Sequence, residues 1–326
     1  GSCRWRKGSA ILIPSLVAFG ILAYMLWRVW DDLMVTIAHI HPLYLAFAVL
    51  ICALAWVMRG WRYQAILGGL TVRLGLTFST ACILLSQTAN LIVPARLGDL
   101  VRIFILKHEG LATYSQGVSS LIVERIFDVV TIALLGLLAL PFVIATPEWF
   151  LPLIVIPIVG GAAFAIFLLL TGNRHSENKY LGIFYSMLTE VRAASLSMRS
   201  AFVLGSSSIG IWLMDVLVCA VIVMMFDESL PFMVIMLAIV IGNLVKAVPI
   251  TPGGVGTYEF ALVITFELAG MAPATATVIA VIDHLVKNLV TLAGGIVSLY
   301  YFGDWSVSLM KHSFWSGLSK EELSES

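Results

Sequence analysis

A series of long apolar segments constrains the fold of this chain more than any other feature. A helix needs about 20 apolar residues to cross the hydrocarbon core of a bilayer, which is about 30 Å thick. Hydrophobic residues make up 60% of the chain and charged residues 12%, whereas soluble domains carry about 25% charged residues. The sequence therefore predicts an all-α polytopic membrane protein and excludes an ordinary soluble enzyme or a disordered chain. Six segments are predicted to span the membrane: 9–30, 43–58, 117–141, 149–171, 201–225 and 275–301.

The charge and cysteine content argue against several kinds of partner. Lys and Arg together number 19, as do Asp and Glu, so the chain lacks the basic surplus that nucleic-acid binding requires. The four cysteines show no metal-ligand spacing, and no HExxH, GxSxG or P-loop motif occurs. We therefore expect no metal and no cofactor. Gly1-Ser2 is typical of a cloning scar, which leaves open whether residues are missing upstream, and 9–30 is interpreted as a retained helix.

Two further apolar regions, 74–108 and 230–270, are interrupted in the middle by Pro and Gly. Such a region can cross the membrane once, or it can enter and return as a re-entrant hairpin. The distribution of Lys and Arg favours the second layout, because cytoplasmic loops carry an excess of these residues. If the regions crossed, the loop 172–200 and its four Lys and Arg residues would move outside. We therefore predict two re-entrant broken-helix hairpins, with 94–98 and 249–256 buried at membrane depth.

In this layout both termini are cytoplasmic, and 302–326 is a polar cytoplasmic tail. The segment 179–199 is amphipathic, with Tyr180, Phe184, Met187, Leu188 and Val191 on one face, and is predicted to lie on the inner membrane surface.

The same layout predicts an inverted repeat within a single membrane domain, 1–326. Each half contains a helix, a helix, a broken hairpin and a helix, and the two halves are 9–141 and 149–301. The spacing of acids agrees, since Asp99 and Glu124 are 25 residues apart and Glu259 and Asp283 are 24 apart. Inverted repeats with broken helices are typical of transporters, and the broken segments indicate the substrate site.

Charged side chains gather around both breaks, where they are costly and usually functional. The predicted site residues are Asn90, Arg96, Asp99, Arg102, Glu124, Arg125 and Asp128 in the first half, and Asn243, Lys246, Gly253, Gly254, Glu259, Asp283, His284 and Lys287 in the second. Helical spacing places Asp99 with Arg102, Glu124 with Asp128, and Asp283 with Lys287 on shared faces. An alternative is that these pairs only hold helices together.

New helices are predicted to begin near Gly98 and Thr257, just after the breaks. A helix N-terminus favours an anion, and Arg binds phosphate through two parallel hydrogen bonds. Arg96 and Arg102 are therefore predicted to hold a lipid phosphate near the bilayer midplane. The interpretation of other polar residues is less specific. His284 is either an interior histidine or a proton carrier, Asp215 is a counter-ion or reaches the interface, and Arg59, Trp61 and Arg62 are interpreted as an interfacial anchor.

Three motifs together resemble a known family. They are N-x3-P-x-R-x-G-D-x2-R from Asn90 to Arg102, E-R-x2-D from Glu124 to Asp128, and P-x2-P-G-G-V-G-x2-E from Pro249 to Glu259. In this order they are similar to the membrane region of lysylphosphatidylglycerol synthase/flippases. The resemblance implies translocation of a phospholipid in a prokaryotic cell membrane. No counterpart of the soluble aminoacyl-transfer domain occurs among these 326 residues, so we do not expect them to carry out lysyl-lipid synthesis. Relatives associated with glycosyltransferases imply a polyprenyl-phosphate-linked sugar as another cargo.

We therefore expect a flippase or scramblase-like transporter of a phospholipid or a polyprenyl-phosphate-linked lipid, and not an enzyme. One alternative is an intramembrane lipid-modifying enzyme that uses Glu124, Asp128 and His284 as acid and base groups. Another is a non-transporting membrane subunit of a separate synthase or glycosyltransferase. We expect the membrane lipid to be a partner, and we expect no nucleic-acid partner. Association with a separate synthase or glycosyltransferase, and formation of a homo-oligomer, are left undecided.

Overall fold

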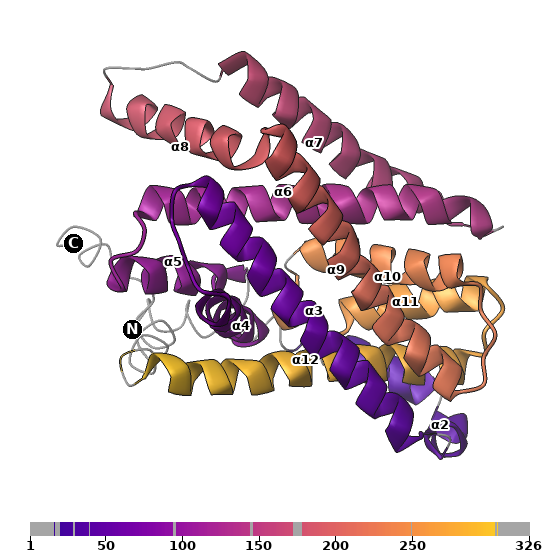
Figure 1. The fold of residues 1–326 in the computed structure, drawn as a ribbon. Helices are drawn as coiled ribbons and strands as arrows, with labels where there is room; N and C mark the ends of the chain where they lie inside the picture. The colour runs from indigo at the N-terminus through magenta and orange to yellow at the C-terminus, as the bar shows by residue number, and fades with distance from the viewer. Residues whose placement is uncertain are drawn as a thin grey trace, which may run out of the picture.

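The computed structural model describes residues 16, 20–28, 30–38, 40–93, 96–143, 146–171, 178–248, 250–303 and 305. These residues form helices, and no strand occurs among them (Figure 1). Half of the predicted span 9–30, together with Pro94, Pro249 and nearly all of the tail, lies outside the described residues. The helices are α2 (Trp30–Ile37), α3 (Pro42–Gly69), α4 (Leu76–Ile92), α5 (Asp99–His108), α6 (Tyr114–Ala139), α7 (Phe150–Thr171), α8 (Lys179–Ser195), α9 (Met198–Met225), α10 (Phe232–Ala247), α11 (Thr257–Leu268) and α12 (Pro273–Phe302).

Four of the described helices are long and apolar enough to cross a membrane, namely α3, α7, α9 and α12. They correspond to four of the six predicted spans, and they identify the chain as an integral membrane protein. The predicted span 117–141 forms as α6, but Glu124, Arg125 and Asp128 lie within it. The predicted end of α3 at residue 58 is wrong, because the helix continues to Gly69. Arg59 and Arg62, which suggested an end, have acidic partners inside the protein.

Both predicted breaks are present, and helices begin after them where the sequence indicated. The first break separates α4 from α5, which begins at Asp99, and the second separates α10 from α11, which begins at Thr257. Gly98 is required in the first break because a Cβ there would lie 2.5 Å from the backbone nitrogen of Asn90. The second break turns through Gly253 and Gly254, which have φ of 62° and 77°.

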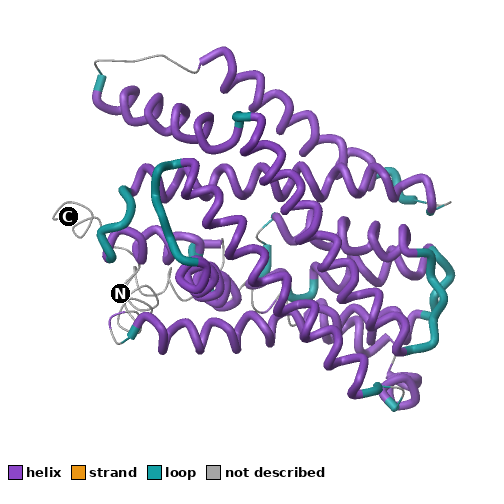
Figure 2. The backbone as a smooth tube through the Cα atoms, in the orientation of Figure 1, coloured by secondary structure: helices purple, strands orange, loops and turns teal. Residues whose placement is uncertain are grey.

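Helices from the two halves of the chain occupy corresponding positions (Figure 1). In this view α4 and α5 on one side, and α10 and α11 on the other, lie between α6 and α12, while α3 and α9 pack together and cross over them. Contacts also occur in corresponding pairs: α4 packs on α12 as α10 packs on α6, and α3 packs on α4 as α9 packs on α10. Figure 2 shows the loops after α3 and α5 at one end of the molecule, and the loops before α10 and α12 at the other.

The buried core lies between these helices, and the outer helices carry exposed apolar residues. One core cluster joins α6, α9, α10, α11 and α12, and a second joins α3, α4, α5, α6 and α8. On α8 the predicted apolar face is divided: Leu188 and Val191 are buried, whereas Tyr180 and Phe184 are exposed. The side chains of α8 that pack inward meet α6, which also donates Ser115 Oγ and Ser119 Oγ to Glu190.

Candidate functional site

A cavity of about 170 Å³ lies where the two breaks meet α3, α6, α9 and α12. A single water needs only about 10–15 Å³ on this measure, so the cavity has room for a small polar group. Its lining contains more basic than acidic side chains. The bases are Arg59, Arg62, Arg96, Arg125, Lys246 and Lys287, and the acids are Glu124, Asp128 and Asp215.

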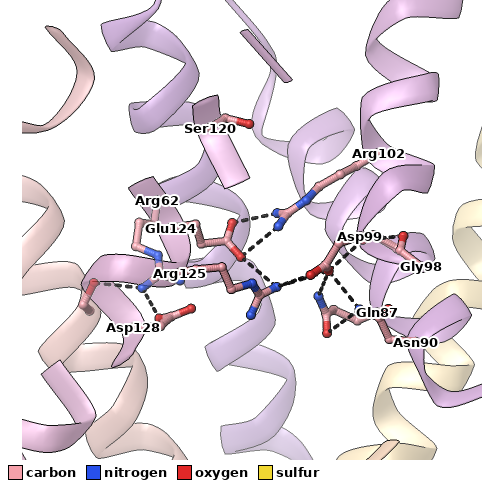
Figure 3. Close-up of polar contacts among 12 residues, drawn as sticks. Arg62, Gln87, Asn90, Gly98, Asp99, Arg102, Ser120, Glu124, Arg125 and Asp128 are labelled. Atoms are coloured by element: carbon pink, nitrogen blue, oxygen red, sulfur yellow. Dashed lines mark hydrogen bonds and ion pairs between the residues drawn. The ribbon is translucent and has the colours of Figure 1, made fainter. Parts of the chain in front are cut away.

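The most deeply buried ion pair joins α5 to α6 (Figure 3). Arg102 donates from Nη1 to Glu124 Oε2 at 2.7 Å and from Nη2 to Oε1 at 3.1 Å. Its guanidinium also lies 4.9 Å from the ring centre of Tyr63. Arg102 is 0% exposed and does not line the cavity. The predicted direct contact of Arg102 with phosphate therefore needs correction, because Glu124 already occupies both ends of its fork.

Asp99 holds three cavity residues in place (Figure 3). Its Oδ1 accepts hydrogen bonds from Asn90 Nδ2 at 2.8 Å and from Gln87 Nε2 at 3.0 Å. Arg125 Nη2 donates to the same carboxylate at 3.1 Å. Asp99 stands in the first turn of α5, where a negative charge compensates the helix dipole. A carboxylate thus already lies beside the N-terminus of α5.

Arg62 forms a second buried pair that the sequence analysis missed. Its Nη1 lies 2.6 Å from Asp128 Oδ1 and 2.8 Å from Ser208 Oγ, and Trp212 Nε1 donates to the same carboxylate oxygen at 3.1 Å. The interpretation of Arg62 as an interfacial anchor is wrong, because the residue is 2% exposed. Neighbouring Arg59 also faces the cavity and stacks on Trp56 at 4.8 Å.

In the second half, a chain of polar contacts leads away from the cavity. Lys246 Nζ lies 3.3 Å from His284 Nε2, and His284 Nδ1 lies 2.7 Å from Glu259 Oε1. The other oxygen of Glu259 accepts a hydrogen bond from the backbone nitrogen of Gly256 at 2.7 Å. Glu259 therefore caps α11 with its own side chain.

The predicted pair of Asp283 and Lys287 is present, with Nζ 2.9 Å from Oδ2. Tyr258 donates its hydroxyl to the same oxygen at 2.7 Å. Lys287 also lies 3.4 Å from Asp215, and Arg59 lies 3.9 Å from the other oxygen of Asp215. Asp215 is therefore a counter-ion shared by two cavity bases.

Two cavity bases differ from the rest. Among the residues that the structure describes, neither Arg96 nor Lys246 has a carboxylate within 4.0 Å. Arg96 has a left-handed backbone with φ of 56°, and such strain is typical of functional sites. Gly254 makes room for Lys246, because a Cβ at residue 254 would lie 2.5 Å from Lys246 Cγ.

The structure brings the predicted site residues together, in two roles. Four of them lie behind the lining, where each holds a residue that faces the cavity: Asp99, Arg102, Glu259 and Asp283. The others line the cavity. Among them, Asn243 Nδ2 donates a hydrogen bond to Asp215 Oδ2 at 3.5 Å. Sequence reasoning gave too little weight to Arg59, Arg62, Trp212 and Asp215. The signal that could have found the two arginines is their three-residue spacing, which places them on one face of a continuing helix.

The fold and the site together define a polytopic helical membrane protein with a charged cavity enclosed by broken helices. Residues 11–295 match the family described as the lysylphosphatidylglycerol synthase TM region, and the chain belongs to this family.

The relatives with assigned names include a glycosyltransferase and two proteins named as membrane proteins. "Glycosyltransferase AglD" of Haloferax volcanii is 32% identical over 303 residues, which cover 79% of this chain and 49% of that protein. The chain thus spans about half the length of this relative. A "UPF0104 membrane protein" of Methanothermobacter thermautotrophicus is 20% identical, over 91% of this chain and 96% of the relative. Another of that name, in Methanocaldococcus jannaschii, is 24% identical over 65% of this chain and 92% of its own length. No solved structure matches the chain.

Proposed function

We propose that this protein moves an anionic lipid between the two leaflets of a prokaryotic cell membrane, and that the cavity holds the lipid phosphate. One observation carries the proposal: Arg96 and Lys246 face the cavity, one beside each break, and no described carboxylate pairs with either. A buried charge without a partner is costly. A phosphate that binds between these bases compensates both charges at once, and Arg is suited to bind it through two parallel hydrogen bonds.

The distribution of charge supports an anionic ligand. The lining contains six bases and three acids. When the four supporting residues are added, the network contains seven bases and six acids. The network is therefore nearly balanced as a whole, while the surface that a ligand meets is basic. Such an arrangement lowers the cost of placing a phosphate within the hydrocarbon core.

We further propose that 9–141 and 149–301 form an inverted repeat with six spans and two re-entrant hairpins, and that both termini are cytoplasmic. The corresponding contacts of α4 with α12 and of α10 with α6 support this layout. So does the segregation of loops to two ends of the molecule in Figure 2. In such a layout the cavity lies at the interface of the repeats, as in transporters that expose one site to the two sides alternately.

A second candidate function follows from the relative named a glycosyltransferase. This chain corresponds to about half of that protein, so a membrane subunit that serves a separate glycosyltransferase is the alternative. A lipid-linked sugar phosphate is then a cargo to test beside a phospholipid. An enzymatic role for Glu124 and Asp128 has less support, since each is held by a buried arginine.

Movement of labelled lipids in vesicles that contain only this protein tests the proposal. Vesicles carry either nitrobenzoxadiazole-labelled phosphatidylglycerol or a labelled polyprenyl phosphate, and dithionite added outside reports exposure of the label. We expect the purified protein to accelerate exposure of at least one probe. The Arg96→Gln, Lys246→Gln double variant should be slower by roughly tenfold or more, because each charged hydrogen bond is worth about 1.5–3 kcal/mol.

Arg73→Gln is a matched control, because Arg73 is exposed in the loop after α3. Movement of neither probe above the level of empty vesicles contradicts the transport proposal and favours the subunit. Full activity of the double variant contradicts the assignment of the phosphate site.

A further inference from the structure

The chain of contacts behind Lys246 links the cavity to a buried acid. A lysine ammonium can only donate a hydrogen bond, so His284 accepts at Nε2, 3.3 Å from Lys246 Nζ. His284 then carries its proton on Nδ1 and donates it to Glu259 Oε1, 2.7 Å away. The imidazole is therefore neutral and lies between a positive charge in the cavity and a negative charge behind it.

Glu259 depends on Lys246 for its opposing charge. No described Lys or Arg lies within 4.0 Å of Glu259, and its other partner is the backbone nitrogen of Gly256. Glu259 is 4% exposed and His284 is 1% exposed, so water does little to reduce the interaction between the two charges.

Apart from Arg96, the remaining charged groups around His284 are matched with one another. Asp283 and Asp215 pair with Lys287 and Arg59. Arg96 acts on Lys246 from the first break. The groups that face His284 or its immediate partners are Lys246 of α10, Tyr258 and Glu259 of α11, Asp283 and Lys287 of α12, Asp215 and Cys219 of α9, and Arg96 of the first break.

We infer that binding of an anion in the cavity is coupled to uptake of one proton by the His284 and Glu259 pair. The inference rests on the proposed function, because it takes Lys246 as an anion ligand. When Lys246 turns to the anion, its ammonium no longer occupies His284 Nε2 or compensates Glu259. A hydronium ion from the solvent then gives its proton to Nε2: one O–H bond breaks, one N–H bond forms, and a water molecule is released. The resulting imidazolium restores the charge balance with Glu259.

This coupling has a consequence for transport. A phosphodiester with one negative charge binds together with one proton, so the loaded cavity gains no net charge. The loaded form therefore crosses between its two states without moving charge through the bilayer, and a proton gradient can drive it.

Calorimetry on the whole protein in a non-ionic detergent tests the coupling. The probe is dihexanoylphosphatidylglycerol, a soluble phosphodiester that does not titrate near neutral pH. Binding is measured at pH 7 in buffers with different ionisation enthalpies, and the slope of the observed enthalpy gives the number of protons taken up. We expect uptake of about one proton, and an affinity that rises up to tenfold per unit of falling pH.

Two variants locate the proton. His284→Gln and Glu259→Gln should each bind the probe with proton uptake near zero, and Glu259→Gln serves if His284→Gln does not fold. His108→Gln, outside the cavity on α5, should keep the wild-type uptake. Tight binding by the wild type with no proton uptake overturns the coupling but leaves the proposed function intact. Unchanged uptake in both variants also overturns it. Absence of binding, together with absence of transport of both labelled lipids, overturns both proposals.

Discussion

Replacing Arg102 should lower the stability of the protein, whereas replacing Arg96 should slow lipid movement, although the two residues are close in the sequence. Arg102 is fully buried and donates two hydrogen bonds to Glu124. Arg102→Gln leaves Glu124 as a buried charge with only Arg125 at 3.5 Å. Breaking such a pair costs roughly 3–5 kcal/mol. In a protein of this size about 2 °C of melting temperature corresponds to 1 kcal/mol, so we expect a decrease of roughly 6–10 °C.

Arg96→Gln breaks no ion pair with a described carboxylate, and its melting temperature should change by about 1 °C or less. Lipid movement should nevertheless slow by roughly tenfold or more, because the phosphate loses a charged hydrogen-bond donor. We therefore expect Arg102→Gln to lower the melting temperature and Arg96→Gln to slow lipid movement at an almost unchanged melting temperature.

The protein offers its own reporter of unfolding. Cys52, Cys82 and Cys219 are free and buried, so a dye that fluoresces on reacting with thiols reports their exposure as the protein melts in detergent. Cys3 is replaced by Ser in every variant to reduce the background. A double variant, Arg102→Met with Glu124→Leu, removes both charges and should recover most of the lost stability.

A specific result would refute this reasoning. If Arg102→Gln keeps the wild-type melting temperature and abolishes lipid movement, Arg102 acts on the lipid directly. If both single variants lose the same stability, Arg96 has a structural partner and is not the phosphate ligand.

Two further predictions concern the second break and the topology. Gly254→Ala forces a Cβ against Lys246 in a left-handed backbone and should lower both the melting temperature and the rate of lipid movement, whereas Gly205→Ala, with open space around its Cα on α9, should lower neither. In a background without reactive cysteines, Gly110→Cys and Ser200→Cys should react with an impermeant thiol reagent from the same side of the membrane, and labelling from opposite sides contradicts the re-entrant layout.

Local signals predicted the helices and the breaks. Apolar length indicated the spans now seen as α7 and α9, and the Pro and Gly residues of the two breaks indicated helix starts at Asp99 and Thr257 within one residue or so. These features depend on neighbours in the sequence. Hydropathy alone could not show that α3 continues past Arg59, because that depends on Asp215 of another helix.

The role of each charged residue could not be predicted in the same way. Helical spacing suggested that Asp99 and Arg102 share a face, but the structure pairs Asp99 with Arg125 and Arg102 with Glu124, both across helices. Spacing along one helix says which side chains are adjacent, and says nothing about which helix supplies the partner. Identifying Lys246 as a base without a carboxylate likewise required the positions of all described acids around the cavity.

The buried pairing of Arg62 gives a further test of whether a charged residue's role follows from its neighbours in the sequence or from a partner on another helix. An interfacial anchor formed by Trp61 and Arg62 predicts that replacing either residue has a small and similar effect. The structure predicts a large difference, because Arg62 is buried against Asp128 and Ser208 while Trp61 is 44% exposed. Arg62→Met should cost roughly 3–5 kcal/mol in the thiol-dye assay, since it leaves Asp128 buried with Trp212 as its main donor. Trp61→Ala should cost less than about 1 kcal/mol.

Adding Asp128→Leu to Arg62→Met should restore stability, whereas an interfacial anchor gives no reason for such a rescue. Equal losses for Arg62→Met and Trp61→Ala, with no rescue, would mean that Arg62 faces the membrane surface and that the acids of α6 find their charge balance elsewhere.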